Sequence, residues 1–245
     1  LMETASPISN NWTSVKDHAR VFGDLVFVYP VISRRSAGLS IGANLNPDKR
    51  CNFDCVYCEV DRKMPGRATA VDLGQLREEL TWLLRFVRER GLMADPKYSE
   101  VPREIATTVR DIAFSGDGEP TMIPNFSECV QLAADVKRAE NLPDAKLVLI
   151  TDAAGLDKLD VRRGLEIMDA NQGEIWGKLD AGTEPYFRQV NRSFVRFERI
   201  LKNLLETARV RPIIIQSLFF KIHGKPMRSE EHTSELQSHS DLVCR

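Results

Sequence analysis

The sequence predicts an α/β protein in which helices cover a parallel β-sheet. Short apolar runs of strand length alternate along the chain with longer segments whose apolar residues recur at helical spacing. Strands that alternate with helices form right-handed βαβ units, so they run parallel to one another. The pattern fits an incomplete (βα) barrel or an open doubly wound sheet, and 245 residues suffice for one such domain with a sizeable core.

Five segments have the length and apolar character of strands. The segment 109–114 leads into a glycine-containing turn, and 146–151 is a continuous apolar run of the buried type. In chain order, the predicted strands are 41–44, 109–114, 146–151, 174–179 and 212–220. Residues 1–30 have a mixed pattern from which no element is predicted.

Four segments have the apolar spacing of helices. The clearest is 72–90, in which leucine and valine residues recur mostly three or four positions apart. Asp72 is placed to cap its first turn, and Gly91 is placed to end it. The other predicted helices are 126–140, 156–168 and one marked by the apolar residues from Phe194 to Leu205.

The loops with the most distinctive residues all follow predicted strands. They are the cysteine-containing loop after 41–44, the turn 115–121 and the strand ends near Thr151 and Asp180. In both candidate architectures, ligands bind at the carboxyl ends of the parallel strands. We therefore expect these four segments to converge at one edge of the sheet.

The composition is that of a soluble globular protein. Hydrophobic residues make up 42% of the chain and charged residues 28%, which excludes a wholly disordered chain. No apolar run approaches the roughly 20 residues that a membrane-spanning helix requires. The N-terminus has no secretory signal, so the cytoplasm is the expected location. A formal net charge of −1 argues against a strongly polyanionic partner but permits a local basic patch.

The last residues break the pattern of the rest of the chain. Residues 229–245 are polar without helical or strand periodicity, and they resemble translated sequencing-adapter read-through. An ordinary polar tail is the alternative. We expect residues 1–38 to be an N-terminal extension, 39–228 to be the core and 229–245 to be a non-native tail. Three residues are then excluded from metal binding: His232, His239 and Cys244.

Three of the five cysteines, Cys51, Cys55 and Cys58, lie within eight residues in a C-x3-C-x2-C spacing. Thiolates are soft ligands that favour iron–sulfur clusters and zinc. Three thiolates can each bind one iron of a four-iron cluster and leave the fourth iron open to a ligand. A structural zinc site needs four protein ligands, and Cys129 lies far along the chain on a predicted helix. An iron–sulfur cluster is therefore favoured over zinc and over uncommitted cysteines.

The cysteine loop resembles that of the radical S-adenosylmethionine (SAM) enzymes. Tyr57 occupies the family's aromatic position before the third cysteine. The resemblance implies that this ring lies near the adenine of SAM, and packing within the loop is the alternative. The similarity covers roughly residues 29–222 of the chain.

Residues 115–120, with the sequence SGDGEP, resemble the family's glycine-rich segment after the second strand. Glycine permits positive φ and a close approach of the backbone to a ligand. The resemblance implies that Gly116, Gly118 and Glu119 bind the methionyl ammonium group of SAM. Asp117 between the two glycines departs from the commonest form of the family.

Two further strand ends resemble SAM-binding positions of the family. Thr151 and Asp152 match a Thr-Asn segment after the third strand, with Asp152 in place of the Asn. Lys178 and Asp180 match a Lys/Asp position after the fourth strand. The resemblance implies that Lys178 pairs with the SAM carboxylate and that Asp180 contacts the ribose or the substrate. A surface ion pair is the alternative for these two residues.

Residues 29–42 and 114–121 resemble a subgroup related to tRNA wyosine-synthesis enzymes. The chain has no second cysteine set for the auxiliary cluster that wyosine chemistry would require. Six strands are usual in the core of the family, whereas five are predicted, so we expect a partial (βα) barrel of the radical SAM type that is truncated at its C-terminus. Residues 213–219 would then expose apolar side chains and unpaired backbone groups at the last strand.

The resemblance implies an enzyme that cleaves SAM reductively at a four-iron, four-sulfur (4Fe–4S) cluster and forms a 5′-deoxyadenosyl radical, which abstracts hydrogen from a substrate. Cys51, Cys55 and Cys58 are the implied metal ligands. The implied partner is an external one-electron reductant of the flavodoxin or ferredoxin type. The substrate is unidentified, and RNA is one candidate. Two alternatives stay open, namely an activase that installs a radical on a partner protein and a noncatalytic iron–sulfur or zinc module.

Overall fold

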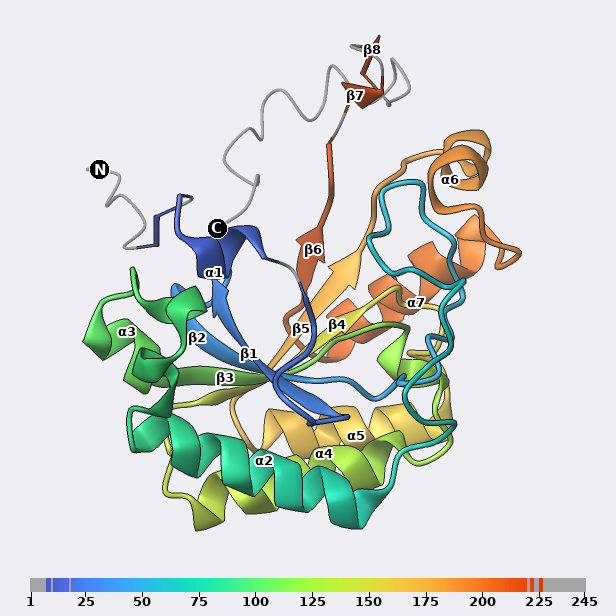
Figure 1. Cartoon of the computed structure of the whole chain (residues 1–245). Helices are drawn as coiled ribbons and strands as arrows, with labels where there is room; N and C mark the ends of the chain where they lie inside the picture. Colours follow the sequence, from blue (N-terminus) through green and yellow to red (C-terminus); the bar gives the residue numbers. More distant parts are fainter. Residues whose placement is uncertain (1–7, 10, 18, 220, 223–224, 227–245) are drawn as a thin grey trace, which may run out of the picture.

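The computed structural model describes residues 8–9, 11–17, 19–219, 221–222 and 225–226. A six-stranded sheet has its strands in chain order, with β1 and β2 antiparallel and the others parallel (Figure 1). The strands are β1 (Val28–Ser33), β2 (Gly38–Ala43), β3 (Val109–Phe114), β4 (Lys146–Thr151), β5 (Gly173–Lys178) and β6 (Ile214–Gln216). A separate two-stranded sheet joins β7 (Lys221–Ile222) and β8 (Lys225–Pro226). The protein is therefore the partial (βα) barrel that the alternation of strands and helices predicts.

Helices connect the parallel strands, and α2, α4 and α5 lie along one face of the sheet (Figure 1). The α-helices are α1 (Thr13–Lys16), α2 (Leu73–Arg88), α3 (Arg103–Thr107), α4 (Phe126–Ala139), α5 (Leu159–Asp169), α6 (Glu184–Asn191) and α7 (Phe197–Val210). Short 3-10 turns are η1 (Gly91–Ala94), η2 (Pro96–Tyr98) and η3 (Pro120–Met122). No helix of the described residues combines the length and the apolar character that crossing a membrane requires.

Both faces of the central strands are buried. The main hydrophobic core, which includes Ile112 and Leu147, lies between the sheet and its covering helices. The alternate residues Ala113, Val148 and Trp176 form a smaller buried cluster on the inner face. Burial on both faces accounts for the continuous apolar runs of these strands, because neither face needs polar side chains.

The five predicted strands are all present; β3 and β4 have the predicted ends, whereas β2, β5 and β6 begin or end elsewhere. β2 begins at Gly38, and only residues 214–216 of the predicted last strand pair with β5. β1 was not predicted, although residues 28–33 lie in the predicted N-terminal extension and pair with β2. Its Pro30 lacks a backbone N–H and is tolerated because β1 pairs on one side only.

The predicted start of α2 is confirmed, but its end differs from the prediction. Asp72 accepts a hydrogen bond from the backbone N–H of Gln75 at 2.9 Å and caps the helix. Arg90, not Gly91, adopts the left-handed conformation, with φ of 68°. Gly91 instead leaves room for Phe86, whose ring would lie 2.4 Å from an added Cβ atom.

Three other sequence expectations have clear outcomes. Cys129 is fully buried in α4, which confirms its predicted place in the core. The predicted helix 156–168 begins at Leu159, after a turn that contains Ala153 at φ of 66°. The exposure predicted at 213–219 is confirmed in part: Ile215, Leu218 and Phe219 are exposed, whereas the backbone N–H of Leu218 is bonded to Asp180. The predicted tail 229–245, with His232, His239 and Cys244, lies outside the described residues.

Candidate functional site

The predicted convergence at the carboxyl edge of the parallel sheet is confirmed by hydrogen bonds between loops. The backbone N–H of Glu119, after β3, donates to the carbonyl oxygen of Arg50, after β2, at 3.0 Å. The Asn44 side chain, at the end of β2, donates to Asp117 at 2.8 Å. Asn52 in the cysteine loop reaches Asp152 after β4 at 3.4 Å. The loops after β2, β3 and β4 thus form one surface.

Each sulfur atom of the cysteine loop has an N–H donor. These bonds run from the backbone of Phe53 to Cys51 Sγ at 3.5 Å, from Asn191 Nδ2 to Cys55 Sγ at 3.3 Å and from Arg62 Nη1 to Cys58 Sγ at 3.2 Å. N–H donors stabilise negative charge on sulfur and tune the reduction potential of iron–sulfur clusters. Three N–H groups are therefore placed to stabilise negative charge on the cysteine sulfur atoms.

The three thiols differ in their exposure and electrostatics. Cys51 and Cys55 are half-buried, whereas Cys58 is exposed. Burial, followed by the nearby carboxyl group of Asp152, raises the pKa of Cys51 to about 12. Burial also raises the pKa of Cys55. A bound cation deprotonates such thiols outright, because its charge outweighs both effects.

The donor set fits an iron–sulfur cluster better than a zinc site. Among the described residues, no three His, Cys, Asp or Glu side chains gather closely enough to hold one metal ion. A structural zinc site requires four ligands around a single ion at about 2.0–2.3 Å. A 4Fe–4S cluster is wider, because each thiolate binds a different iron. The three cysteines of the loop supply the three thiolates that such a cluster would use, whereas a structural zinc site would need a fourth ligand.

Asp180, just after β5, connects the cysteine loop to three other segments. Its buried carboxylate accepts hydrogen bonds from the Tyr57 hydroxyl, from Asn191 Nδ2 at 3.3 Å and from the backbone N–H of Leu218 at 2.9 Å. Lys178 Nζ pairs with the same carboxylate at 3.1 Å. Three predicted SAM-binding residues, Tyr57, Lys178 and Asp180, therefore lie together.

The Tyr57 ring is held between these charged groups. Lys178 Nζ lies 5.3 Å from the centre of the ring, a cation–π contact. Burial, and then the negative charge of Asp180, raises the pKa of the Tyr57 hydroxyl, which therefore stays protonated and donates. Both proposed roles of Tyr57 in the sequence, loop packing and adenine contact, remain compatible with this position.

Glu119 joins the ends of β3 and β4. Its Oε1 atom accepts three hydrogen bonds, from the Thr121 backbone and hydroxyl and from the Thr151 hydroxyl at 2.6 Å. Its Oε2 atom accepts a hydrogen bond from the backbone N–H of Asp152 at 2.7 Å. Burial raises the pKa of Glu119. Its SAM-binding role stays a prediction.

The glycine-rich turn packs against the cysteine loop. A Cβ atom on Gly118 would lie 1.8 Å from the carbonyl oxygen of Arg50, and one on Gly116 would lie 2.4 Å from Asn44 Oδ1. Neither glycine has positive φ, since Gly23 is the single glycine with positive φ among the described residues. These glycines are needed for close approach between two loops.

Three residues make contacts in the site that the sequence analysis did not assign. Asp117, the departure from the family pattern, pairs with Arg20 at 3.5 Å and accepts from Asn44. Arg62 lies four residues after Cys58 and carries a detectable signal, a cation near a thiol. Asn191 carries none, because it is 136 residues away from Cys55 on an unpredicted helix.

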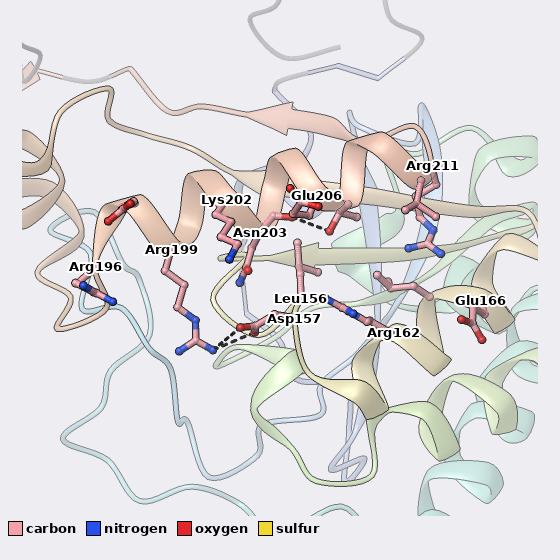
Figure 2. A pocket seen from close by; sticks show the side chains of 14 residues that line it. Leu156, Asp157, Arg162, Glu166, Arg196, Arg199, Lys202, Asn203, Glu206 and Arg211 are labelled. Carbon is pink, nitrogen blue, oxygen red and sulfur yellow. Dashed lines mark hydrogen bonds and ion pairs between the residues drawn. The ribbon is translucent and has the colours of Figure 1, made fainter.

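A hollow of about 690 Å³ lies elsewhere, between α5 and α7 on the outer face (Figure 2). Charged side chains of both signs line it, and Arg199 pairs there with Asp157 at 3.0 Å. None of the predicted site residues contributes to its lining. It is therefore separate from the candidate site at the carboxyl edge.

No protein-family model matches the chain. The chain is 26% identical over 213 residues to the GTPase Obg of Brachyspira hyodysenteriae, covering 85% of this chain and 26% of that protein. It is 29% identical over 164 residues to the UPF0026 protein MJ1312 of Methanocaldococcus jannaschii, covering 66% of this chain and 43% of that protein. It is 22% identical over 183 residues to a UPF0026 protein of Helicobacter pylori, covering 74% of this chain and 51% of that protein. The chain thus spans about a quarter to a half of the length of these relatives. It contains no G-K-[ST] sequence, the end of a nucleotide-binding P-loop.

Among solved structures, the chain is similar to TYW1 with a lysine–pyruvate adduct bound, at 16% identity and a TM-score of 0.45, with 76% of this chain and 56% of that chain covered. It is similar to archaeal TYW1 at 14% identity and a TM-score of 0.44, with 85% and 61% covered. It is also similar to BtrN in complex with AdoMet and 2-DOIA, at 15% identity and a TM-score of 0.37, with 72% and 56% covered. At these values, the likeness assigns no activity, substrate or partner to this chain.

Proposed function

We propose that this chain is a radical SAM enzyme whose Cys51, Cys55 and Cys58 hold a 4Fe–4S cluster. One observation carries the proposal: three thiols on one eight-residue loop, each with an N–H donor, lie at the carboxyl edge of a parallel sheet. This is the edge at which α/β proteins bind their ligands. The resemblance of the loop to the radical SAM spacing supports the same reading.

The residues of the site divide into cluster ligands and SAM ligands. When bound and reduced, a 4Fe–4S cluster supplies the electron that cleaves SAM to methionine and a 5′-deoxyadenosyl radical. Lys178 offers a cation for the SAM carboxylate and Glu119 Oε2 an acceptor for its ammonium group. Tyr57 offers a ring face for the adenine. Four further residues close this surface: Gly116, Gly118, Thr151 and Asp180.

An external one-electron reductant, of the flavodoxin or ferredoxin type, is part of the proposal. Cys58 is exposed, whereas the other two cysteines are half-buried. The cluster would therefore approach the protein surface at Cys58, where a docked donor can transfer an electron. Free thiols favour a reducing compartment, and we propose the cytoplasm.

Anaerobic reconstitution of the full chain tests the proposal. We expect about four irons and four sulfides per chain, since each thiolate binds one iron and the fourth stays open. With dithionite and SAM, the reconstituted protein should release 5′-deoxyadenosine, measured by chromatography. Cys55→Ala should abolish both results, whereas Cys129→Ala, the matched control in the core of α4, should retain both.

Other outcomes distinguish the alternatives. A full cluster in the Cys55→Ala chain would refute the assignment of ligands. A cluster that binds no SAM would identify a noncatalytic iron–sulfur module, and stoichiometric zinc without iron would identify a zinc module. SAM cleavage that installs a stable radical on a partner protein would identify an activase.

A further inference from the structure

A cavity of about 390 Å³ lies on the inner face of the sheet, on the side away from α2, α4 and α5 (Figure 1). Apolar side chains from several strands line it, among them Val31, Ile150 and Ile214, together with the indole ring of Trp176. This volume lies in the range of about 300–1,000 Å³ that is typical of small-molecule sites. In such sites a few polar groups fix the orientation of the ligand, so the polar side chains of the lining indicate which ligand fits.

The charged side chains of the lining already have partners. The ion pairs are Asp17 with Lys97, Arg20 with Asp117 and Arg35 with Asp111, and Arg34 also has an interaction partner. A charged ligand would have to break one of these pairs and leave one of its members unpaired, which costs free energy. The cavity therefore favours a ligand without net charge.

Gln216, the last residue of β6, brings an unpaired polar group to the same cavity. It is half-buried, and neither the oxygen nor the nitrogen of its side-chain amide has a hydrogen-bond partner among the described residues. Side chains alternate along a strand, and Ile214, two residues earlier, packs on the inner cluster. The amide of Gln216 therefore lies on the inner face, where it can both donate and accept a hydrogen bond.

The backbone around Gln216 is held by hydrogen bonds to the segment at the end of β5. The carbonyl oxygen of Gln216 accepts from the backbone N–H of Leu179 at 3.0 Å, and the Ser217 hydroxyl donates to the carbonyl oxygen of Leu179. The backbone N–H of Leu218 donates to Asp180 at 2.9 Å. A ligand thus meets an amide on a backbone that is already ordered, which reduces the entropy cost of binding.

The register of β5 and β6 sets the spacing between the indole ring and the amide. Trp176 pairs with Ile214 and Lys178 pairs with Gln216, so the amide lies two residues closer to the carboxyl edge than the ring does. Two residues of a strand span about 7 Å, roughly the length of two fused six-membered rings. A flat ligand on Trp176 therefore reaches Gln216 with the group at its end, beside Lys178 of the candidate site.

We propose that the inner cavity binds a small neutral aromatic molecule whose ring packs on Trp176 and whose carboxamide-type donor and acceptor pair with the Gln216 amide. The ring matches the apolar walls, and the paired state of the charged residues matches a neutral ligand. Two amides in one plane exchange a pair of N–H···O=C bonds, so one glutamine can hold and orient the ligand. The role of this ligand as the substrate of the radical reaction rests on the proposed function, whereas its binding does not.

Calorimetric titration of the reconstituted full chain with three probes tests the proposal. 2-Naphthamide carries the amide, 2-acetonaphthone has the same shape without the N–H donor, and 2-naphthoate carries a negative charge. We expect 2-naphthamide to bind about fivefold more tightly than the ketone, because it makes one more hydrogen bond. It should also bind more tightly than 2-naphthoate. Equal binding of the amide and the ketone, a preference for 2-naphthoate, or no binding of 2-naphthamide at its solubility limit overturns the proposal.

Two variants locate the binding. Gln216→Leu should abolish the preference for the amide over the ketone without lowering the midpoint of unfolding, because the side-chain amide has no partner to lose. Trp176→Leu should weaken both probes alike and retain the preference, because the ring packs on the part that the two probes share. Gln189→Leu, the same change at an exposed position of α6, is the matched control and should bind as the wild type does. A preference that survives in Gln216→Leu overturns the proposal, even if Trp176→Leu fails to fold.

The same titration on the Cys55→Ala chain separates this inference from the proposed function. A preference for the amide that persists without a cluster supports the binding site independently of SAM chemistry. The same preference in a wild-type chain that assembles no cluster leaves the binding site standing and removes the radical reaction. No preference in a chain that assembles the cluster and cleaves SAM removes this inference and leaves the proposed function standing.

Discussion

Asp152 is buried beside Glu119, and its Oδ2 atom has no hydrogen-bond partner among the described residues. Burial, and then the negative charge of Glu119, raises the pKa of Asp152 well above the ordinary value for an aspartate. The folded chain therefore binds more protons here than the unfolded chain does. Stability is then lost as pH rises from the unfolded pKa through the raised folded pKa.

Asp152→Asn should stabilise the protein at neutral pH. The change removes a buried carboxyl group whose ionisation is opposed by burial and by the charge of Glu119, and an amide does not ionise. We expect the free energy of unfolding to rise by about 1–3 kcal/mol, the cost of a buried unsatisfied polar group. Urea denaturation across a series of pH values should show a weaker fall in stability with rising pH. Asp157→Asn is the control, because Asp157 lies in a surface ion pair with Arg199. If Asp152→Asn had the same pH profile of stability as the wild type, this explanation would be wrong.

Among the described residues, Asn191 is the one donor to the cysteine sulfur atoms that lies outside the cysteine-loop region. An N–H donor stabilises the more negative, reduced state of a cluster. Asn191→Leu should therefore lower the reduction potential of the reconstituted cluster by roughly tens of millivolts, measured by redox titration with electron paramagnetic resonance. Gln189→Leu, an exposed position on the same helix, should leave it unchanged. An unaltered potential in the Asn191 variant would show that this bond does not reach the cluster.

At the scale of elements, the parts that could be predicted have local signals. α2 carries its own cap at Asp72 and a full stripe of apolar residues, and the cysteine spacing is contained in eight residues. β1 contains Pro30, and α6 is only eight residues long, so tertiary contacts stabilise both. The convergence of the loops followed from parallel strands alone. The bonds of Asp180 to Asn191 and Leu218 did not, because they depend on where α6 and the end of β6 come to lie.

The packing of the glycine-rich turn on the cysteine loop gives a test at this scale. Gly118→Ala would place a Cβ atom 1.8 Å from a carbonyl oxygen of the cysteine-loop segment, so the two loops must separate. We expect a loss of about 1–3 kcal/mol in stability, as for overpacked cores, and a reduced iron content after reconstitution. Gly74→Ala near the start of α2 is the control, with an expected change within about 1 kcal/mol. Full iron content and stability in the Gly118 variant would be inconsistent with this contact.

For the whole molecule, the two edges of the sheet differ. β1 forms one edge of the sheet, and its proline disfavours pairing of this edge with another chain. At β6, Ile215, Leu218 and Phe219 are each more than a third exposed. We propose that in the natural protein this edge is covered, and that residues 229–245 are a non-native tail that follows a core in which β1 takes part.

Ile215→Lys should reduce self-association of the chain. A charge on an apolar edge strand opposes edge-to-edge pairing. We expect a higher soluble concentration and less light scattering on warming than in the wild type. Val210→Lys is the matched control, because Val210 is 72% exposed on α7 and lies outside the strand. If both variants improve solubility equally, net charge alone accounts for the effect.

The hydrogen bonds of Asp180 also set an order of events during folding. Its carboxylate holds Tyr57 from the cysteine loop, Asn191 from α6 and Leu218 from beyond β6. Contacts between residues so far apart in the sequence form late, because the entropy cost of closing the long loops precedes the stabilisation that the contacts provide. The cysteine loop therefore reaches its final geometry only after most of the chain has folded. Under the proposed function, iron would then enter a nearly complete protein, and a chain still being synthesised would hold three free thiols until its last strand docks.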